Sequence, residues 1–227
     1  MIKLKIFFVS LACVVIPISL VTSNITYLTN SDWLYSYNWW RNDIAINTGL
    51  SIEQLNNGSE QIKNYFINDQ EKLDLIIKDD KSQRSLYNER EISHMIDVKY
   101  IMKTVYINAI VFTFLLILTF ISIVFIFRRE SFDILTTSIK ISSFIFGLFV
   151  IILIVASLTD FTWLFTQFHL ISFSNDLWIL DPRTDYLIMM FPERFFLETT
   201  LMIGFLTLIE YAGLYTGSRL CKIRFSH

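Results

Sequence analysis

The sequence predicts an all-α membrane protein with four transmembrane helices and an extracytoplasmic cap of mixed, mainly helical structure. The first observation is composition: 53% of the 227 residues are hydrophobic and 16% are aromatic, which is too apolar for an ordinary soluble domain. The second is the presence of four predominantly apolar runs long enough to cross most of a hydrocarbon core. The third is that two longer stretches between these runs are rich in polar and ionisable residues.

The order of apolar and polar stretches predicts eight segments. Four are membrane spans, at residues 1–23, 104–128, 141–158 and 197–217. Residues 24–103 form the predicted cap, and residues 159–196 form a second external or interfacial segment that carries the candidate active site. Residues 129–140 are a predicted cytoplasmic loop, and residues 218–227 a cytoplasmic tail that includes His227.

The first span needs to be distinguished from a cleavable signal peptide, because Lys3 and Lys5 precede an uncharged apolar run. The following residues, V-T-S-N-I-T, form a poor cleavage site, so a retained helix is predicted. Cys13 is not a lipobox cysteine, because Ser10 occupies the position where leucine is expected.

Short basic flanks predict the orientation of the chain. With four spans, eight lysines and arginines fall on one side, and an excess of such residues marks the cytoplasmic side. Both termini are therefore predicted to be cytoplasmic, and both polar segments external. The eight residues are Lys3, Lys5, Arg128, Arg129, Lys140, Arg219, Lys222 and Arg224.

Within the cap, Ser51 and Gln54 have the spacing of a helix-capping box. The helix that follows is expected to be weakened or broken at Asn56-Asn57-Gly58. Residues 73–77 are short and apolar, and fit either a strand or a buried helical turn. In the fourth span, Glu210 is expected to form a hydrogen bond within the helix bundle.

Several chemistries lack their usual residues in this sequence. The net charge of −2 and the absence of a basic stripe argue against nucleic acid as a partner. There is no GxSxG serine elbow, no HExxH zinc motif and no glycine-rich phosphate loop, and neither Cys13 nor Cys221 is predicted to be external. No cofactor or metal site is implied.

Two histidines are predicted to share the external face, which points to acid–base chemistry. Asp97 follows His94 by three residues, so a helix would bring the two side chains close. A carboxylate there is expected to fix the imidazole tautomer and stabilise its charged form. Near His169, the neighbouring carboxylates in sequence are Asp176, Asp181 and Asp185.

The stretches around these histidines, E-R-E-I-S-H-M-I-D-V-K at 89–99 and F-H-L-I-S-F-S-N-D-L-W-I-L-D-P-R-T-D-Y-L-I-M-M-F-P-E-R-F-F at 168–196, together carry a resemblance. The chain resembles the bacterial lipoprotein intramolecular transacylase family over nearly its whole length, least over residues 56–85. The resemblance implies an enzyme of the bacterial cytoplasmic membrane whose substrates are lipoproteins with a diacylglyceryl-modified N-terminal cysteine. The sn-2 acyl chain moves to the α-amino group of that cysteine, which gives a lyso-form, N-acylated lipoprotein, and the family's paired histidines map onto His94 and His169.

The residues fit that reaction for a physical reason. An amine tethered to the ester that it attacks needs no acyl-enzyme, so the missing serine or cysteine nucleophile is expected. A neutral imidazole can accept the amine proton, and a second can donate to the departing glycerol oxygen. We predict His169 as the base and His94, with Asp97, as its partner.

Other residues of the two motifs keep two interpretations. Arg90, Asn175, Asp176, Asp181 and Asp185 either orient the histidines and the ester or cap helices and solvate the interface. Phe173 and Trp178, with three later phenylalanines, either line an acyl groove or anchor the protein among membrane lipids. Two other functions stay open: a non-enzymatic membrane receptor or assembly factor, and a metal-dependent membrane hydrolase using His94, Asp97 and His169.

Overall fold

The computed structural model describes residues 1–79 and 82–225, so His227 lies outside the described residues. The described chain is mostly helical and divides into two compact units. We call the first the bundle unit (Met1–Thr26, Val105–Val155 and Leu201–His227) and the second the histidine unit (Tyr27–Thr104 and Ala156–Thr200).

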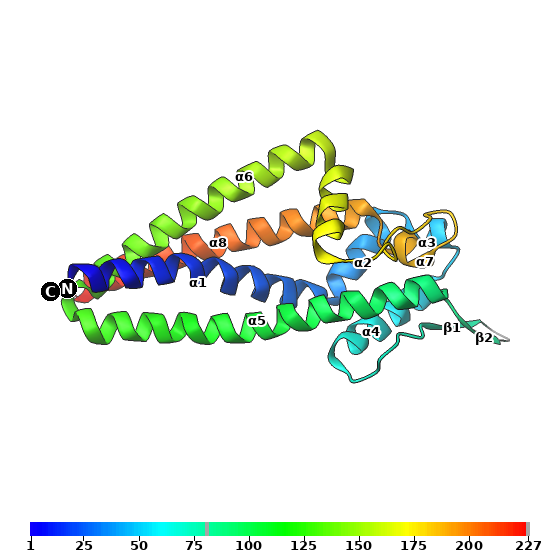
Figure 1. Ribbon diagram of the computed structural model, residues 1–227, viewed down its shortest axis with the longest axis horizontal. Helices are drawn as coiled ribbons and strands as arrows, with labels where there is room; N and C mark the ends of the chain where they lie inside the picture. The colour runs from blue at the N-terminus through cyan, green and yellow to red at the C-terminus, as the bar shows by residue number, and fades with distance from the viewer. Residues whose placement is uncertain (80–81, 226–227) are drawn as a thin grey trace. The chain divides into compact units, whose positions relative to one another are not determined.

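Four long helices supply most of the structure: α1 (Ile2–Thr29), α5 (Glu89–Phe127), α6 (Ser131–Ser172) and α8 (Glu193–Phe225) (Figure 1). Three helical stretches are long and apolar enough to cross a membrane, namely Ile2–Thr29, Glu89–Ser172 and Glu193–Ile223. The middle stretch has 84 residues because the 3₁₀ turn η1 (Arg128–Glu130) joins α5 to α6. The membrane-protein class is confirmed by these helices, and the number of crossings stays a prediction.

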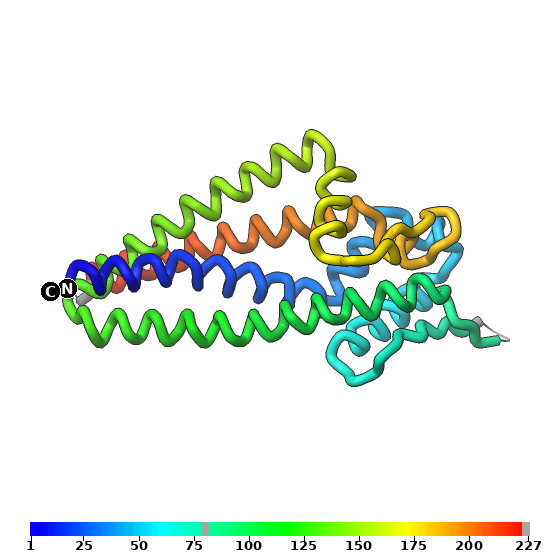
Figure 2. The backbone as a smooth tube through the Cα atoms, viewed as in Figure 1, coloured from blue at the N-terminus to red at the C-terminus, as the bar shows by residue number. Residues whose placement is uncertain are grey.

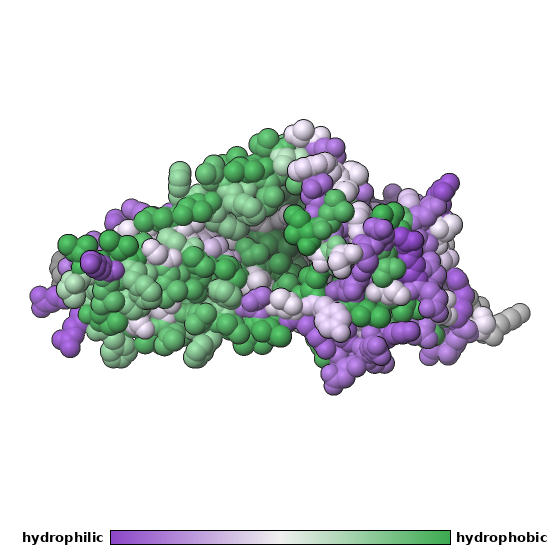
Figure 3. Space-filling model, in the orientation of Figure 1, coloured by the Kyte–Doolittle hydropathy of each residue, from purple (hydrophilic) through white to green (hydrophobic). Residues whose placement is uncertain are grey.

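The helices of the bundle unit expose large apolar side chains such as Phe114, Phe144 and Phe205. A helix that is apolar all round is typical of a membrane span, because lipid rather than water faces its outer side. Hydrophobic residues accordingly cover the face of this unit that is visible in Figure 3.

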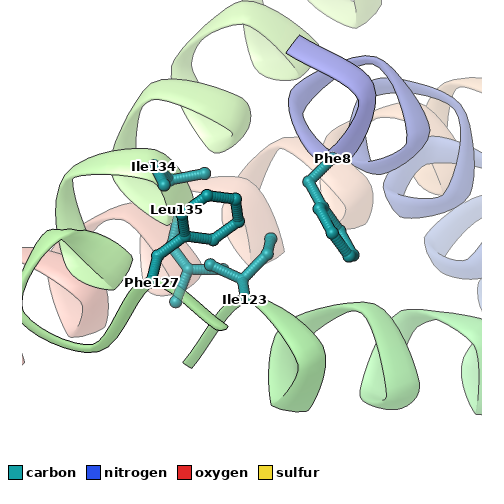
Figure 4. Packing of buried hydrophobic residues seen from close by; sticks show 5 residues of the cluster. All are labelled: Phe8, Ile123, Phe127, Ile134 and Leu135. Carbon is teal, nitrogen blue, oxygen red and sulfur yellow. The ribbon is translucent and has the colours of Figure 1, made fainter. Parts of the chain in front are cut away.

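The interior of the bundle unit is packed from residues of α1, α5, α6 and α8. Around Phe8, the buried residues Ile123, Phe127, Ile134 and Leu135 form one cluster (Figure 4). A second cluster contains Ala12, Ile16, Ile139, Phe146 and Tyr211.

Polar side chains link the helices of the bundle unit across this apolar interior. The side-chain amide of Asn24 in α1 donates to Thr207 Oγ1 at 3.0 Å and to Glu210 Oε2 at 2.8 Å, both in α8. Such bonds stabilise helix pairs by about 1 kcal/mol where no water competes. The expectation that Glu210 forms a hydrogen bond within the bundle is confirmed.

Two ion pairs connect the ends of helices in the bundle unit. Lys5 Nζ near the start of α1 lies 2.8 Å from Glu130 Oε2 in η1. Lys222 near the end of α8 pairs with Asp133 in the first turn of α6. Several of the basic residues that predict orientation therefore lie at the same end of this unit.

The histidine unit contains α2 (Asp32–Arg41), α3 (Ile44–Thr48), α4 (Ile52–Ile67) and α7 (Tyr186–Met190). It also contains an antiparallel pair of strands, β1 (Ile76–Asp79) and β2 (Ser82–Ser85), in which Ile76 pairs with Ser85. Of the apolar stretch 73–77, only the last two residues enter a strand, while Leu73, Leu75 and Ile77 are all buried.

Helix α4 confirms one local prediction and corrects another. Ser51 and Gln54 form the predicted capping box, each side chain accepting from the other residue's backbone N–H. Of the two expected effects of Asn56-Asn57-Gly58, weakening or a break, the break is wrong, because α4 continues through these residues to Ile67. Gly58 is buried against side-chain atoms of Met190 and Leu75, so tertiary packing outweighs its low helix propensity.

Candidate active site

The start of α5 places three motif residues on one helix face. Asn88 caps this helix: its Oδ1 accepts from the backbone N–H groups of Arg90 and Glu91 at 2.9 and 3.0 Å. Arg90, His94 and Asp97 follow at intervals of four and three residues, so their side chains leave α5 on the same side. This part of α5 carries charged residues throughout and precedes the predicted span at 104–128.

A break in α6 defines the segment that carries His169. Asp160 has non-helical dihedral angles (φ −161°, ψ 94°), and the backbone changes direction there (Figure 2). Its Oδ1 accepts from the Trp163 N–H at 2.9 Å, as an N-cap residue does. Residues 161–172 therefore form a separately capped helical segment, which ends shortly after His169.

The two imidazoles come together in the histidine unit. Their ring centroids are 6.1 Å apart, and His94 and His169 are only 6% and 7% exposed. Phe173 contacts both rings, with centroid distances of 5.0 Å to His94 and 5.5 Å to His169. The ring centroid of Phe165 lies 4.3 Å from that of His169, and Trp178 stacks on the His169 ring with a centroid distance of 4.8 Å. The pair therefore sits among aromatic rings, with little contact with water.

One hydrogen bond assigns the tautomer of His169. Its Nδ1 lies 2.7 Å from the backbone carbonyl oxygen of Phe165. A carbonyl only accepts, so Nδ1 carries the proton and Nε2 of the neutral ring carries a lone pair. Burial lowers the pKa of His169, although the Phe165 carbonyl and the charge of Glu193 oppose the shift. A neutral imidazole with a basic Nε2 results.

His94 is neutral for a related reason. Burial, and then the proximity of His169, lower the pKa of His94 to about 4, while Asp97 acts in the opposite direction. Asp97 was expected to stabilise the charged imidazole, but burial outweighs it here. The Asp97 carboxylate instead accepts from the Asn175 side-chain amide at 2.9 Å, and His94 Nδ1 has no partner among the described residues.

The polar residues of the second motif attach the loop after α6 to the His94 face of α5. Arg90 donates to the backbone carbonyl of Asp176, and Asn175 donates to Asp97. Asn175 Oδ1 also accepts from the N–H of Leu177 at 3.0 Å. The structure thus brings Arg90, Asn175 and Asp176 beside the histidines, where they hold Phe173 and Trp178 in place.

Asp181 and Asp185 stabilise the loop farther along. The paired guanidinium of Arg183 holds the pKa of Asp181 down to about 2. Asp185 accepts from the side chain of Asn88 at 3.0 Å and from the backbone N–H of Asp181 at 2.8 Å. Their hydrogen bonds go to this loop and to the start of α5 rather than to the imidazoles.

Glu91 is a site-forming residue that the sequence reasoning did not select. Its side chain is 1% exposed, and its two oxygens accept from the backbone N–H groups of Asn88 at 2.8 Å and Leu187 at 2.6 Å. The carboxylate therefore joins the start of α5 to the start of α7. Its position three residues after Asn88 is the capping-box spacing, which is the signal that could have found it.

The same side chains do not form a metal site. Among residues 1–79 and 82–225, no three His, Cys, Asp or Glu side chains converge in a way that could hold a metal ion. Asp97 is engaged by Asn175, and His169 Nδ1 by a carbonyl. The arrangement instead offers two neutral imidazoles, one with an assigned basic nitrogen.

Comparison with known proteins decides the family. The model of the family described as lipoprotein intramolecular transacylase Lit matches residues 10–196, which include both histidine motifs. The chain belongs to the Lit family. This membership confirms the resemblance found in the sequence, and it supports the general function of a membrane acyltransferase that acts on lipoproteins.

Solved Lit structures share this fold. The lipoprotein intramolecular transacylase Lit from Bacillus cereus superposes with a TM-score of 0.81 and 18% identity, covering 99% of this chain and 98% of that one. A variant of the same protein with a histidine replaced by arginine superposes with a TM-score of 0.77 and 19% identity. The match covers 99% of this chain and 96% of the variant's chain. A search of curated proteins finds no significant match.

Proposed function

We propose that this Lit-family protein transfers an acyl chain within a single lipoprotein molecule. The substrate carries a diacylglyceryl group in thioether linkage on its N-terminal cysteine. The sn-2 acyl chain moves from the glyceryl oxygen to the α-amino nitrogen of the same cysteine, and the product is a lyso-form N-acylated lipoprotein. The observation that carries the proposal is the close pair of neutral imidazoles, 6.1 Å between centroids, in a chain of this family.

The two imidazoles supply the proton transfers. The amine nitrogen attacks the ester carbonyl carbon, a C–N bond forms, and Nε2 of His169 accepts a proton from the nitrogen. The tetrahedral intermediate then collapses, the bond between the carbonyl carbon and the glycerol oxygen breaks, and that oxygen takes up a proton. His94, next to His169, is the partner through which the proton is returned. Positioned acid–base groups of this kind raise the rate of the catalysed step by about 10²–10⁴-fold.

The aromatic surroundings serve the same reaction. An α-amino group in water has a pKa of about 7.7–8.0 and is mostly protonated at neutral pH. A site with little water favours the neutral amine and a neutral imidazole together, since charged forms are penalised by burial. Phe165, Phe173 and Trp178 around His169 supply that environment. Tethering of amine and ester replaces the need for a covalent acyl-enzyme.

The proposal includes four membrane crossings in the bacterial cytoplasmic membrane, with both termini cytoplasmic and the histidines on the extracytoplasmic face. The 84-residue stretch Glu89–Ser172 is about 126 Å long at 1.5 Å per residue, enough for two crossings and the segments that flank them. The ion pairs of Lys5 and Lys222 support a common cytoplasmic end for α1, α6 and α8.

Mass spectrometry tests the reaction directly. Diacylglyceryl lipopeptide with isotopically heavy acyl chains is mixed with the purified protein, an unlabelled lipopeptide of different mass, and phospholipid. Heavy acyl chain is expected on the amine of the heavy lipopeptide only. Label on the unlabelled peptide would indicate an acyl-enzyme, and acyl chain from phospholipid would indicate an intermolecular N-acyltransferase. A lipopeptide left unchanged would favour the non-enzymatic alternative.

A further inference from the structure

Some buried polar side-chain atoms of the described residues have no hydrogen-bond partner. Four such side-chain atoms occur among the residues that the structure describes: His94 Nδ1, Trp178 Nε1, Glu198 Oε2 and Thr199 Oγ1. Leaving a buried donor or acceptor unpaired costs about 1–3 kcal/mol of folding free energy. Each such atom therefore needs a structural or functional explanation. Two of the four belong to the rings that flank His169, at centroid distances of 6.1 and 4.8 Å.

Trp178 is the more informative of these two residues. An indole N–H can donate a hydrogen bond but cannot accept one, so it needs an acceptor. The indole is stacked on the imidazole of His169 with an interplanar angle of 30°. The ring stacked on His169 therefore carries a buried donor that has no acceptor among the residues that the structure describes.

A hydrogen-bond acceptor and a donor placed together suit the tetrahedral intermediate of acyl transfer from an ester to an amine. When an amine attacks an ester, the nitrogen has a proton to lose and the carbonyl oxygen gains negative charge. The first needs a base and the second needs a fixed hydrogen-bond donor. His169 Nε2 is such a base and Trp178 Nε1–H is such a donor, and the two rings that carry them are stacked.

The loop that carries Trp178 is held in the way that an oxyanion donor requires. Asn175 and Asp176, just before it, bond to Asp97 and Arg90 on either side of His94. The Ile179 N–H donates to the Asp176 carbonyl at 3.2 Å, which closes a turn around Trp178. Donors fixed before the reaction need no reorganisation when charge develops, and this makes them effective.

We infer that Trp178 is a catalytic residue whose indole N–H donates a hydrogen bond to the oxygen of the ester carbonyl under attack. The inference rests on the proposed function. As the C–N bond forms, the π electron pair of the carbonyl moves onto oxygen, and the indole N–H stabilises that charge. When the bond to the glycerol oxygen breaks, the pair returns to form the amide carbonyl. The indole keeps its proton throughout.

The first test removes the donor and keeps an aromatic ring. Trp178→Phe is assayed as the purified full-length protein with a diacylglyceryl lipopeptide. Its kcat is expected to fall about 10²–10³-fold, the usual effect of losing one oxyanion donor, with KM changed by less than about threefold. The control is Trp163→Phe, on the same helical segment as His169 but 56% exposed, which should keep wild-type activity.

The second test separates the hydrogen bond from a structural role. In a thionoester lipopeptide, sulfur replaces the carbonyl oxygen and is a weak acceptor. Trp178→Phe is therefore expected to slow the ester far more than the thionoester, whereas a distorted site would slow both equally. If Trp178→Phe does not fold, 3-benzothienylalanine at position 178 keeps the shape of indole, lacks the N–H, and is judged by the same ratio.

The outcomes distinguish the two levels of the proposal. Wild-type protein that leaves the lipopeptide unchanged would overturn the proposed function itself. Wild-type activity that survives unchanged in Trp178→Phe, or that falls equally for ester and thionoester, would overturn only the role of Trp178. A selective loss with the ester supports the inference.

Discussion

At the scale of single residues, the proposed site contains two imidazoles that are neutral because they are buried. His169 has an assigned tautomer, since the Phe165 carbonyl accepts from Nδ1. His94 has a pKa lowered to about 4, and its Nδ1 has no partner within residues 1–79 and 82–225. A positively charged pair of rings 6.1 Å apart would repel in this environment, so burial and proximity both favour the neutral state.

Removal of either imidazole is expected to stop the reaction. His94→Ala and His169→Ala should each lower the rate of lipopeptide acylation by at least about 10²-fold, because a positioned acid or base is lost. Thermal unfolding in detergent checks that each variant is folded. The third histidine, His227, lies outside both motifs, so His227→Ala is the control. Full activity of either site variant would contradict the acid–base pair.

The pH dependence should follow the substrate rather than the histidines. A histidine base loses activity only below its own pKa, and burial lowers that pKa to about 4 for His94 and below its ordinary value for His169. The α-amino group is reactive only above about pH 7.7–8.0. We expect kcat/KM to rise with pH up to about 8 without an inflection near 6.5. An inflection at 6.5 would show a solvated imidazole instead.

At the scale of elements, three connections position the site: Glu91 between α5 and α7, Asp160 at the break in α6, and Asn175 between the loop and α5. Glu91 and Asp160 accept from backbone N–H groups near the start of a helical segment, and Asn175 donates to the Asp97 carboxylate within α5. The Glu91 and Asn175 bonds join parts of the chain that are distant in sequence, whereas the Asp160 bond is local.

Glu91→Gln tests the connection between α5 and α7. An amide has a single acceptor oxygen, so one of the two backbone N–H groups would face an NH₂ group instead. A buried donor left unpaired costs about 1–3 kcal/mol, and the melting temperature should fall together with activity. Glu89→Gln is the matched control in the same helical turn, where Glu89 is exposed. If both variants melt alike, Glu91 does not join the two helices.

Two glycines should respond in opposite directions to alanine. A methyl group at Gly58 would lie in ordinary contact with Met190 Cε at 3.4 Å and Leu75 Cδ2 at 3.6 Å, and alanine favours the helix interior by about 0.5–1 kcal/mol. Gly58→Ala should therefore raise the melting temperature. Gly49 ends α3 with φ +70°, a conformation that disfavours a side chain. Gly49→Ala should lower the melting temperature, and the reverse order would contradict both assignments.

At the scale of the whole molecule, topology decides whether the histidines can meet a lipoprotein outside the cytoplasm. The proposed orientation rests on basic residues, two of which, Lys5 and Lys222, form ion pairs at one end of the bundle unit. A lipid-anchored substrate reaches only groups on its own side of the membrane, so the orientation is a condition for the proposed reaction.

Cysteine labelling in intact cells tests this topology. In a background with Cys13 and Cys221 replaced by serine, single cysteines are introduced at Glu71, Arg183 and Arg129, which are all exposed. A membrane-impermeant maleimide should label the first two positions from outside, and position 129 only after permeabilisation. Labelling of position 129 from outside, or protection of position 183, would contradict the proposed orientation. The histidines would then not lie on the side of the membrane where the substrate is.

The sequence by itself determined the membrane class, the presence of long apolar helices, the capping box at Ser51 and the Lit family. These features are encoded locally, in apolar runs, in residue spacing and in two motifs whose residues are close in the chain. It also selected the two histidines, because they are the only histidines in the predicted external segments. The continuity of α4 through Gly58 was missed, since the packing of Met190 and Leu75 is distant in sequence.

Only the tertiary structure decided the state of the site. The bond from His169 to Phe165 and the burial that outweighs Asp97 depend on which rings and carbonyls surround each group. The same holds for the indole N–H of Trp178, which has no acceptor in the described part of the chain. Residue spacing could place Asp97 near His94, but not show that Asn175, 78 positions away, takes its carboxylate. Protonation follows from desolvation and hydrogen-bond partners, and both are properties of the folded chain rather than of any short stretch of it.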